Sequence, residues 1–476
     1  MKPRAHKLRQ HLQQLLTPPV ALNLIAHDQV WQEILDHLQP IDFAAEANAG
    51  AGKSPSQADY VVVTIRAVLQ VARTIQCGLC KRFDFVYAFN GAYWREISKD
   101  ALSQFLGAAA VKLGVSAIKA EHWQFRDSLL KQFFSTAYLP EPIRKDDVTL
   151  INFRNGTLEI SSAGWHLRSF DRGDFLTYQV PFDFDEIREA PQWQQFLDRV
   201  QPDVACQQVL AEYLGYCFTR GLKLEKVLLL YGSGANGKSV FCDVVSALLG
   251  DENISHYSLS SLSEPNGYFR ARLANKLLNY GSELDARLQT DAFKQLASGE
   301  RIQARLPYGQ PFELRDYAKL AFNCNELPRD VEHSEAYFRR FLVIPFTVTI
   351  PAAERNVELA NEMIRAELSG VFNWVLAGLK RLLRQKNFSP SDAAKIALAE
   401  YRRESDSVMM FVEEEGYTPS LEDWVLLKTL YAEYRSYCLE AGFKPLGRGK
   451  FGTRLRANQI GMEKERNGFV VYVSRA

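Results

Sequence analysis

The residues that most directly indicate a chemical function are Gly232–Ser239, which read Gly-Ser-Gly-Ala-Asn-Gly-Lys-Ser. This run matches the G-x-x-x-x-G-K-[ST] phosphate loop, in which glycines let backbone N–H groups surround the phosphates of a nucleotide. We expect Lys238 to reach the β- and γ-phosphates and the Ser239 hydroxyl to hold Mg²⁺. ATP and Mg²⁺ are therefore the predicted cofactors. The predicted nucleotide contacts are Gly232, Gly234, Asn236, Gly237, Lys238 and Ser239.

A phosphate loop works only when a strand delivers it and a helix follows it. Val227–Tyr231 is a short apolar run of strand type, and Val240–Leu249 has the spacing of a helix. The alternative, a chance glycine-rich turn, is disfavoured by these two flanking elements. The sequence thus predicts a nucleotide site between a buried strand and the start of a helix.

An acidic residue is expected beside the magnesium ion and the attacking water. Lys276–Glu283 is a strand-like run that ends in Glu283, and Asp285 follows two residues later. Glu283 lies 45 residues after Lys238, which leaves room for one strand–helix unit between them. We predict that Glu283 orients the water and, with Ser239, supports the metal. A surface acid after a buried strand is the alternative.

Two further elements could complete a site for phosphoryl transfer. Lys319–Asn325 reads as an apolar strand that ends in asparagine, and Asn325 could hydrogen-bond both water and the γ-phosphate. Arg339 and Arg340 precede another apolar run, and arginine stabilises charge on a transferring phosphate. Ring-shaped ATPases supply this arginine from a neighbouring subunit. The alternatives are a turn asparagine and, for one of the arginines, an ordinary surface ion pair.

In their order and spacing, these elements resemble the superfamily 3 helicases of the phage, plasmid and poxvirus primase-helicase branch. The resemblance covers about residues 60–470 and includes Lys294–Arg305, which reads Lys-Gln-Leu-Ala-Ser-Gly-Glu-Arg-Ile-Gln-Ala-Arg. Pro307–Phe312 then stands where that family has a DNA-contacting hairpin. The resemblance implies that Lys294 is a second sensor of phosphate and that Arg305 and Tyr308 contact DNA. The hairpin tip departs from the family because it has no Lys or His.

The C-terminal segment is basic. Residues 441–476 hold eight Lys and Arg against two Glu, although the whole chain has a formal net charge of only +1. A helix, a basic helix and a strand pair are expected here, which is the order of a winged helix. The alternative is a winged fold that contacts protein. The predicted phosphate contacts are Arg448, Lys450, Arg454 and Arg456.

Composition narrows the class of protein. The chain has 476 residues, 47% of them hydrophobic and 24% charged, and it has no apolar stretch near the roughly 18–20 residues that span a bilayer. Cys77 and Cys80 form a C-x-x-C pair, but no second pair completes a zinc ribbon, so we interpret the pair as incidental. We expect a protein of a bacterial or host-cell cytoplasm, with no membrane association.

Taken together, these observations predict an α/β fold with an AAA+-like phosphate-loop ATPase core, a mixed α+β N-terminal domain and a C-terminal winged helix. Its length suits two to four domains. The predicted segments are a helical N-terminal segment and linker at 1–56, a mixed pre-helicase domain at 57–190, a helical collar with the ATPase domain at 191–386, and the winged helix at 387–476.

The predicted function is an ATP-driven DNA helicase or translocase for replication of a phage, plasmid or integrated mobile element. We expect a homo-oligomeric ring, a hexamer, with single-stranded DNA in the pore and duplex at the winged helix. A primase or polymerase is a further candidate partner. One alternative is a bifunctional primase-helicase, but no convincing catalytic acid set occurs in the first 200 residues. The other is an initiator or loader that uses ATP only as a switch, which would not need Glu283 together with Asn325 and the arginines.

Overall fold

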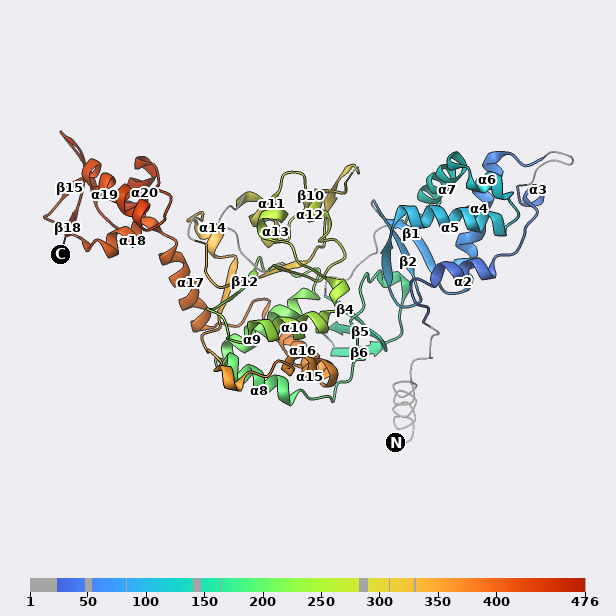
Figure 1. The fold of residues 1–476 in the computed structure, drawn as a ribbon, viewed down its shortest axis with the longest axis horizontal. Helices are drawn as coiled ribbons and strands as arrows, with labels where there is room; N and C mark the ends of the chain where they lie inside the picture. The colour runs from blue at the N-terminus through green and yellow to red at the C-terminus, as the bar shows by residue number, and fades with distance from the viewer. Residues whose placement is uncertain are drawn as a thin grey trace, which may run out of the picture.

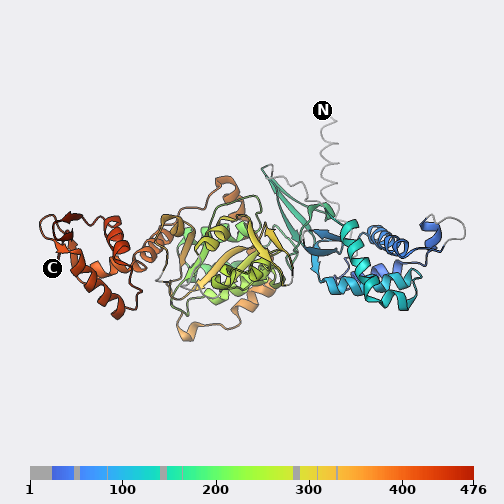
Figure 2. The same cartoon turned by 90° about the horizontal axis from the view of Figure 1, so that it is seen from above.

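The computed structural model of the chain has three parts in a row (Figures 1 and 2). A helical N-terminal part with one small sheet lies at one end, a central part surrounds a parallel sheet, and a small C-terminal part lies at the other end. The residues that the structure describes are 24–47, 54–82, 84–139, 147–162, 164–281, 290–307, 309–328 and 331–475.

The central sheet has five strands within the described ranges, all parallel, in the order β13-β7-β12-β9-β8. Its middle strands are continuous apolar runs, as expected for strands covered on both faces. Because the strands are parallel, all their carboxyl ends lie at one edge of the sheet and all their amino ends at the other. We call these the carboxyl edge and the amino edge. The strands are β7 (Val227–Tyr231), β8 (Ile254–Ser255), β9 (Leu278–Gly281), β12 (Lys319–Cys324) and β13 (Phe341–Pro345).

Helices cover both faces of this sheet, and β7 shows why. Its side chains alternate, so that Leu228 and Leu230 enter one buried core while Val227 and Leu229 enter the other. The helices of the first core are α8 (Pro191–Val200), α9 (Val204–Cys217), α10 (Lys238–Leu249), α15 (Leu359–Ala366) and α16 (Leu368–Gln385). Those on the second face are α11 (Leu259–Ser263), α12 (Tyr268–Ala271), α13 (Thr290–Ser298), α14 (Glu335–Phe338) and α17 (Asp392–Glu404).

The helices predicted for the collar are present as α8 and α9, and α9 is packed tightly against α16. Their role as a collar stays a prediction. A Cβ atom added at Gly215 would lie 2.7 Å from Leu379 Cβ, and one added at Gly378 would lie 2.5 Å from the carbonyl carbon of Ala211. Glu212 of α9 adds polar contacts here. Its carboxylate is fully buried and accepts hydrogen bonds from Arg381 Nε at 2.5 Å and from the Ser389 backbone N at 2.7 Å. Both glycines and this buried ion pair therefore hold α9 against α16.

The N-terminal part has its own core of helices packed on a three-stranded antiparallel sheet. Asn90 and Gly91 lie in the turn between β2 and β3, which pair as an antiparallel hairpin. The helices are α2 (Val30–His37), α3 (Phe43–Glu46), α4 (Gln57–Thr74), α5 (Lys99–Lys112), α6 (Ala117–Glu121) and α7 (Trp123–Thr136). The strands are β1 (Gly78–Arg82), β2 (Phe85–Phe89) and β3 (Trp94–Ile97).

A second small sheet joins the central part instead of the N-terminal core. β4 and β5 form an antiparallel hairpin around Asn155–Gly156, and Phe153 of β4 packs on Phe372 of α16 with ring centroids 4.7 Å apart. The strands are β4 (Thr149–Phe153), β5 (Gly156–Ser161) and β6 (Gly164–Arg168). Single 3₁₀ turns occur at Arg172–Asp174, Asp251–Asn253 and Ala352–Glu354.

The C-terminal part has a separate core and the predicted order of helix, basic helix and strand pair. Its helices are α18 (Ser407–Glu414), α19 (Leu427–Glu440) and α20 (Arg448–Ala457). Its strands are β14 (Tyr417–Pro419), β15 (Val425–Leu426), β16 (Met462–Glu465), β17 (Gly468–Val471) and β18 (Val473–Arg475). Across the described ranges, none of the helices combines the length and the apolar character that crossing a membrane would require.

Candidate functional site

The phosphate-loop residues follow β7 at the carboxyl edge and lead directly into α10. Gly234 and Gly237 have φ angles of 103° and 84°, in the region that favours glycine. A Cβ atom at Gly237 would also lie 2.6 Å from Val200 Cγ1 of the collar helix α8. At Gly232 an added Cβ would collide with the carbonyl oxygen of Phe346, just after β13. The loop therefore has both the backbone conformation and the close surroundings that demand glycine.

Lys238 is the first residue of α10 and is buried, with its Nζ donating to the carbonyl of Gly232. Burial lowers the pKa of Lys238, because the charged ammonium loses hydration there. An anionic ligand beside the ammonium would offset that cost. Asn236 is also buried and donates from Nδ2 to Phe346 O at 3.1 Å, which fixes the loop, while Ser239 is exposed in the first turn of α10.

The other residues expected near the phosphates belong to neighbouring strands. The backbone N of Gly232 donates to Cys324 O at 3.2 Å, so the end of β12 lies against the phosphate loop, and exposed Asn325 follows immediately. Glu283 and Asp285 lie outside the described residues; they follow Gly281, the last residue of β9. The sheet thus brings the loop and Asn325 to one edge, and the position of Glu283 stays a prediction.

One polar group under the loop was missed by the sequence reasoning. Tyr280 of β9 hydrogen-bonds the side chains of Asn323 and Cys242, and burial raises the pKa of Tyr280. Within the described residues the Asn323 Oδ1 atom is buried and has no hydrogen-bond partner. The alternation of side chains along a strand could have indicated this residue, since residue 323 lies on the opposite face of β12 from residues 322 and 324.

Arg339 and Arg340 lie at the amino edge. Val227 N donates to Arg340 O at 2.7 Å at the start of β7 and β13. Five residues of β7 separate this point from the phosphate loop, a span of roughly 16 Å at about 3.3 Å per residue. The two side chains differ: Arg340 is buried and donates to Ser298 Oγ at 2.9 Å, whereas Arg339 is 54% exposed and pairs with Glu225 at 2.9 Å. Neither lies near the phosphate loop of its own chain.

Lys294, in α13, is engaged in an ion pair. Its Nζ lies 2.8 Å from Glu332 Oε1 and 2.9 Å from Oε2. A role for Lys294 as a phosphate sensor would require this pair to open, and that role stays a prediction.

The hairpin expected to contact DNA is present as β10 (Ile302–Arg305) and β11 (Pro311–Leu314). Arg305 is exposed and donates from Nε to Gly309 O at 3.0 Å, while Tyr308 lies outside the described residues. The hairpin also contacts the N-terminal part, because Phe312 meets Phe85 of β2 edge to face at 5.5 Å. Its DNA contacts stay a prediction.

The four basic residues of α20 do not all face outward. Arg448, Lys450 and Arg456 are exposed. Arg454 instead lies with Nε 3.6 Å from Asp406 Oδ2 and donates from Nη1 to His333 O at 3.3 Å. Three of the four are therefore placed for contact with a ligand, and Arg454 joins α20 to the residues before α14.

The described residues contain no cluster of three or more His, Cys, Asp or Glu that could hold a metal ion. Cys77 and Cys80 are buried, and burial raises the pKa of these thiols to about 11 and about 12. Thiolates are the metal-binding form, so the pair is poorly suited to that role. Ser239 is exposed in the first turn of α10 at the carboxyl edge, and its role in holding Mg²⁺ stays a prediction. Glu283, the acid expected to join it, lies outside the described ranges.

Three domain families match separate stretches of the chain. Residues 77–202 match a family described as D5 N terminal like, and residues 403–471 match one described as poxvirus D5 protein-like. Residues 230–340, which include the phosphate loop and the hairpin, match a family of unknown function, DUF5906.

The chain is also similar to viral proteins named as helicases. It is 26% identical to one from Acanthamoeba polyphaga mimivirus over 235 residues, and 23% identical to one from Invertebrate iridescent virus 3 over 271 residues. The alignments cover 47% and 52% of this chain but only 24% and 28% of those proteins, so the chain spans about a quarter of their length. A solved structure titled the A form apo structure of the NrS-1 C terminal region is 14% identical, with a TM-score of 0.48 over 86% of this chain and 98% of that one.

Proposed function

We propose that the chain is a superfamily 3 helicase of the phage and poxvirus type. It would be an ATP-driven DNA helicase or translocase that works as a homo-oligomeric ring, a hexamer, in the replication of a phage, plasmid or integrated mobile element. Its central part would be an AAA+-like phosphate-loop ATPase, with the ATP sites between subunits. Its C-terminal part would be a winged helix that binds duplex DNA.

Support for ATP binding comes from the carboxyl edge. In open parallel sheets, ligands bind outside the carboxyl ends of the strands, where loops leave the sheet. The loop between β7 and α10 leaves there, and its glycines have the conformation that lets backbone N–H groups approach a phosphate. Lys238, buried at the start of α10, would hold the β- and γ-phosphates.

Each residue of this edge then has one task in hydrolysis. Glu283 would accept a hydrogen bond from the attacking water and orient it in line with the bond to be broken. Asn325 would position the γ-phosphate from the end of β12. Ser239 and Glu283 would hold Mg²⁺, which neutralises charge on the phosphate oxygens when bound. Lys238 carries the remaining charge on the protein side.

The separation of Lys238 from the paired arginines carries the proposal of a ring. Arg339 and Arg340 directly precede β13 at the amino edge, so the length of the strands separates both from the phosphate loop of their own chain. An arginine that acts on the γ-phosphate would have to come from a neighbour, and repetition of that contact closes a ring. Exposed Arg339 fits this role, and buried Arg340 supports the segment before β13.

DNA would meet two surfaces of the protein. The β10–β11 hairpin, with Arg305 and Tyr308, would contact single-stranded DNA in the pore. Arg448, Lys450 and Arg456 on α20 would contact phosphates of duplex DNA, as a basic helix does in a winged-helix domain. A primase or polymerase is the partner that such a helicase would serve.

The test is unwinding of a forked DNA duplex by the purified full chain, with ATP and Mg²⁺. We expect strand separation that needs both, and expect Glu283→Gln to retain ATP binding while turnover stops. If the parent protein binds DNA and ATP but never separates strands, the function is that of a switch and not of a helicase. If Glu283→Gln hydrolyses ATP at near the parent rate, another residue orients the water.

A further inference from the structure

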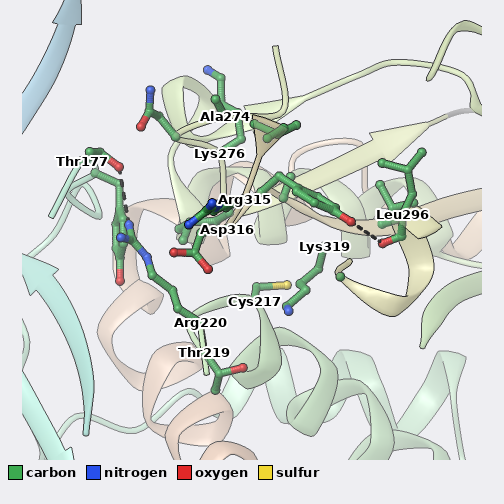
Figure 3. Close-up of a pocket in the computed structure, with 18 of the residues that line it drawn as sticks. Thr177, Cys217, Thr219, Arg220, Ala274, Lys276, Leu296, Arg315, Asp316 and Lys319 are labelled. Atoms are coloured by element: carbon green, nitrogen blue, oxygen red, sulfur yellow. Dashed lines mark hydrogen bonds between the residues drawn. The ribbon is translucent and has the colours of Figure 1, made fainter. Parts of the chain in front are cut away.

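A cavity of about 400 Å³ opens at the amino edge of the central sheet, where the N-terminal part meets it (Figure 3). It is formed by residues distant in the sequence: Arg82 of β1, the 216–226 segment from the end of α9 to the start of β7, the 274–277 segment before β9, and the 312–320 segment from β11 into β12. The Tyr216–Lys226 segment and Lys319 come from the amino ends of β7 and β12, so the cavity lies at the edge opposite the phosphate loop. It is a second candidate site, separated from the first by the length of the strands.

The cavity collects positive charge. Its lining contains eight Lys and Arg and only two acids, in a chain whose formal net charge is +1. One of those acids, Glu313, is already shared between Arg315 at 2.7 Å and Arg301 at 3.6 Å. In the described part of the chain, Lys223 and Lys319 form no ion pair. Figure 3 shows Arg220, Arg315 and Lys319 around the same space.

The positive charges that line the cavity repel one another. Burial lowers the pKa of Lys226 and of Lys276, and the positive charge of Arg339 lowers the pKa of Lys226 further. Gathering like charges in partly buried positions costs free energy that an anion in the cavity would recover. A cluster needed only for solubility would not be enclosed in this way.

Aromatic side chains line the cavity together with the basic groups. The Lys319 ammonium lies over the ring of Tyr216, 4.0 Å from its centroid. Phe312 of the hairpin and Tyr317 also line the cavity. Basic groups that follow a phosphate backbone, combined with ring faces on which bases stack, are the features of sites for single-stranded nucleic acid. A cavity of this volume also lies within the range of small-ligand pockets.

We propose that this amino-edge cavity binds nucleotide phosphates, and that their source is a single DNA strand that passes the β10–β11 hairpin. The inference rests on the proposed function, because it names the path of the strand on the protein. Lys223 and Lys319 would contact phosphates, and partly exposed Phe312 would offer a ring face to a base. A free nucleotide carries the same chemistry, so the test must separate the two sources.

The first experiment measures binding of a labelled oligothymidylate to the full chain by fluorescence anisotropy over a range of salt concentrations. The double variant Lys223→Gln/Lys319→Gln should bind more weakly and lower the log–log salt slope by about 1.4, from about 0.7 per lost single-strand phosphate contact. The control Lys112→Gln/Lys395→Gln removes two exposed lysines that do not line the cavity and should keep the parent slope. Lys223→Arg/Lys319→Arg should also keep it, which separates charge from folding.

The second experiment measures ATP binding by calorimetry in a Lys238→Ala background, where the phosphate loop no longer binds. A remaining nucleotide site that disappears when Lys223→Gln/Lys319→Gln is added would identify a free nucleotide as the ligand. An unchanged DNA slope together with no remaining nucleotide site would overturn the proposal. Both are equilibrium measurements that need no turnover, so a protein that does not unwind DNA would refute the helicase proposal and leave this one standing.

Discussion

The two edges of the central sheet differ in what they are made of. The carboxyl edge is a backbone surface: its loop depends on Gly234 and Gly237 at positive φ, and one buried lysine completes it. The amino edge is a side-chain surface of lysines, arginines and aromatic rings from distant segments. A binding surface made of backbone groups has one productive geometry, and it loses its ligand when any side chain enters that space. A side-chain surface should lose strength in steps, one charge at a time.

The largest effect is expected at the backbone edge, from Lys238→Ala. Nucleotide binding and hydrolysis should both be lost, with turnover lowered by more than about 10³-fold, because the phosphates lose their fixed positive partner. Phosphate release and nucleotide binding measure the two effects, and Lys395→Gln, an exposed lysine on α17, serves as the control. Near-parent hydrolysis by Lys238→Ala would remove the basis for the carboxyl-edge site.

A slightly smaller effect is expected from Arg339→Ala. It should lower kcat by about 10³ while ATP affinity and Tm stay near the parent values, because Arg339 is exposed and would act only on the transferring phosphate. Arg340→Ala should instead lower Tm, since the buried guanidinium bonds Ser298. The ATPase rate, ATP affinity and Tm of the two variants distinguish these roles.

Mixing Arg339→Ala with Lys238→Ala protein tests the same arginine across subunits. Some interfaces in mixed rings would combine an intact phosphate loop with an intact Arg339, so part of the activity should return. No recovery at any ratio, with mixed rings demonstrated by tagged subunits, would place the arginine and the loop in one chain.

A moderate effect is expected at the third surface, α20, which is again made of side chains. Lys450→Gln should lower the log–log salt slope of duplex binding by about 0.9 and leave Tm unchanged. Arg454→Gln should lower Tm, because it breaks the contacts with Asp406 and His333, and should change the slope little. Equal slopes for Lys450→Gln and the parent would favour a protein partner for this domain.

The smallest effect concerns pH. Burial lowers the pKa of Lys238 in the ligand-free protein, and a bound triphosphate should raise it. Between those two pKa values binding takes up a proton, so ATP affinity should fall as pH rises above the ligand-free pKa. Calorimetry in buffers with different ionisation enthalpies measures the proton uptake. No uptake at any alkaline pH would mean that Lys238 keeps its proton in both states.

The sequence predicts the structure well where the residues that determine an element lie close together in the chain. The strand β7, the loop and α10 could be predicted because an apolar run, glycines at fixed spacing and a helical pattern occur within 25 residues of each other. The sequence could not distinguish Arg339 from Arg340. The hydrogen bond of the buried Arg340 side chain is to Ser298, which is far away in the chain. Arg454 was predicted to face DNA with its neighbours, although it lies next to the buried Leu455, which was an available signal.

The amino-edge cavity had no sequence signal at all. Its basic residues come from near positions 82, 220, 276 and 315, and no spacing rule connects them. Only the order of the parallel strands brings these segments together, because the strand starts meet at one edge. The same rule explains why the carboxyl-edge loop and Asn325 meet, since β7 and β12 are parallel neighbours and both end at that edge.

Strand β12 belongs to both edges. It begins at Lys319 in the cavity and ends at Cys324, whose carbonyl accepts from Gly232 N of the phosphate loop. Two ligands that bias one shared element have a coupling free energy, and such coupling is reciprocal. If a DNA strand in the cavity tightens ATP binding tenfold, ATP must tighten DNA binding tenfold as well, about 1.4 kcal/mol in each direction. The grip on DNA would then rise and fall with each nucleotide bound and released, through six residues of one strand.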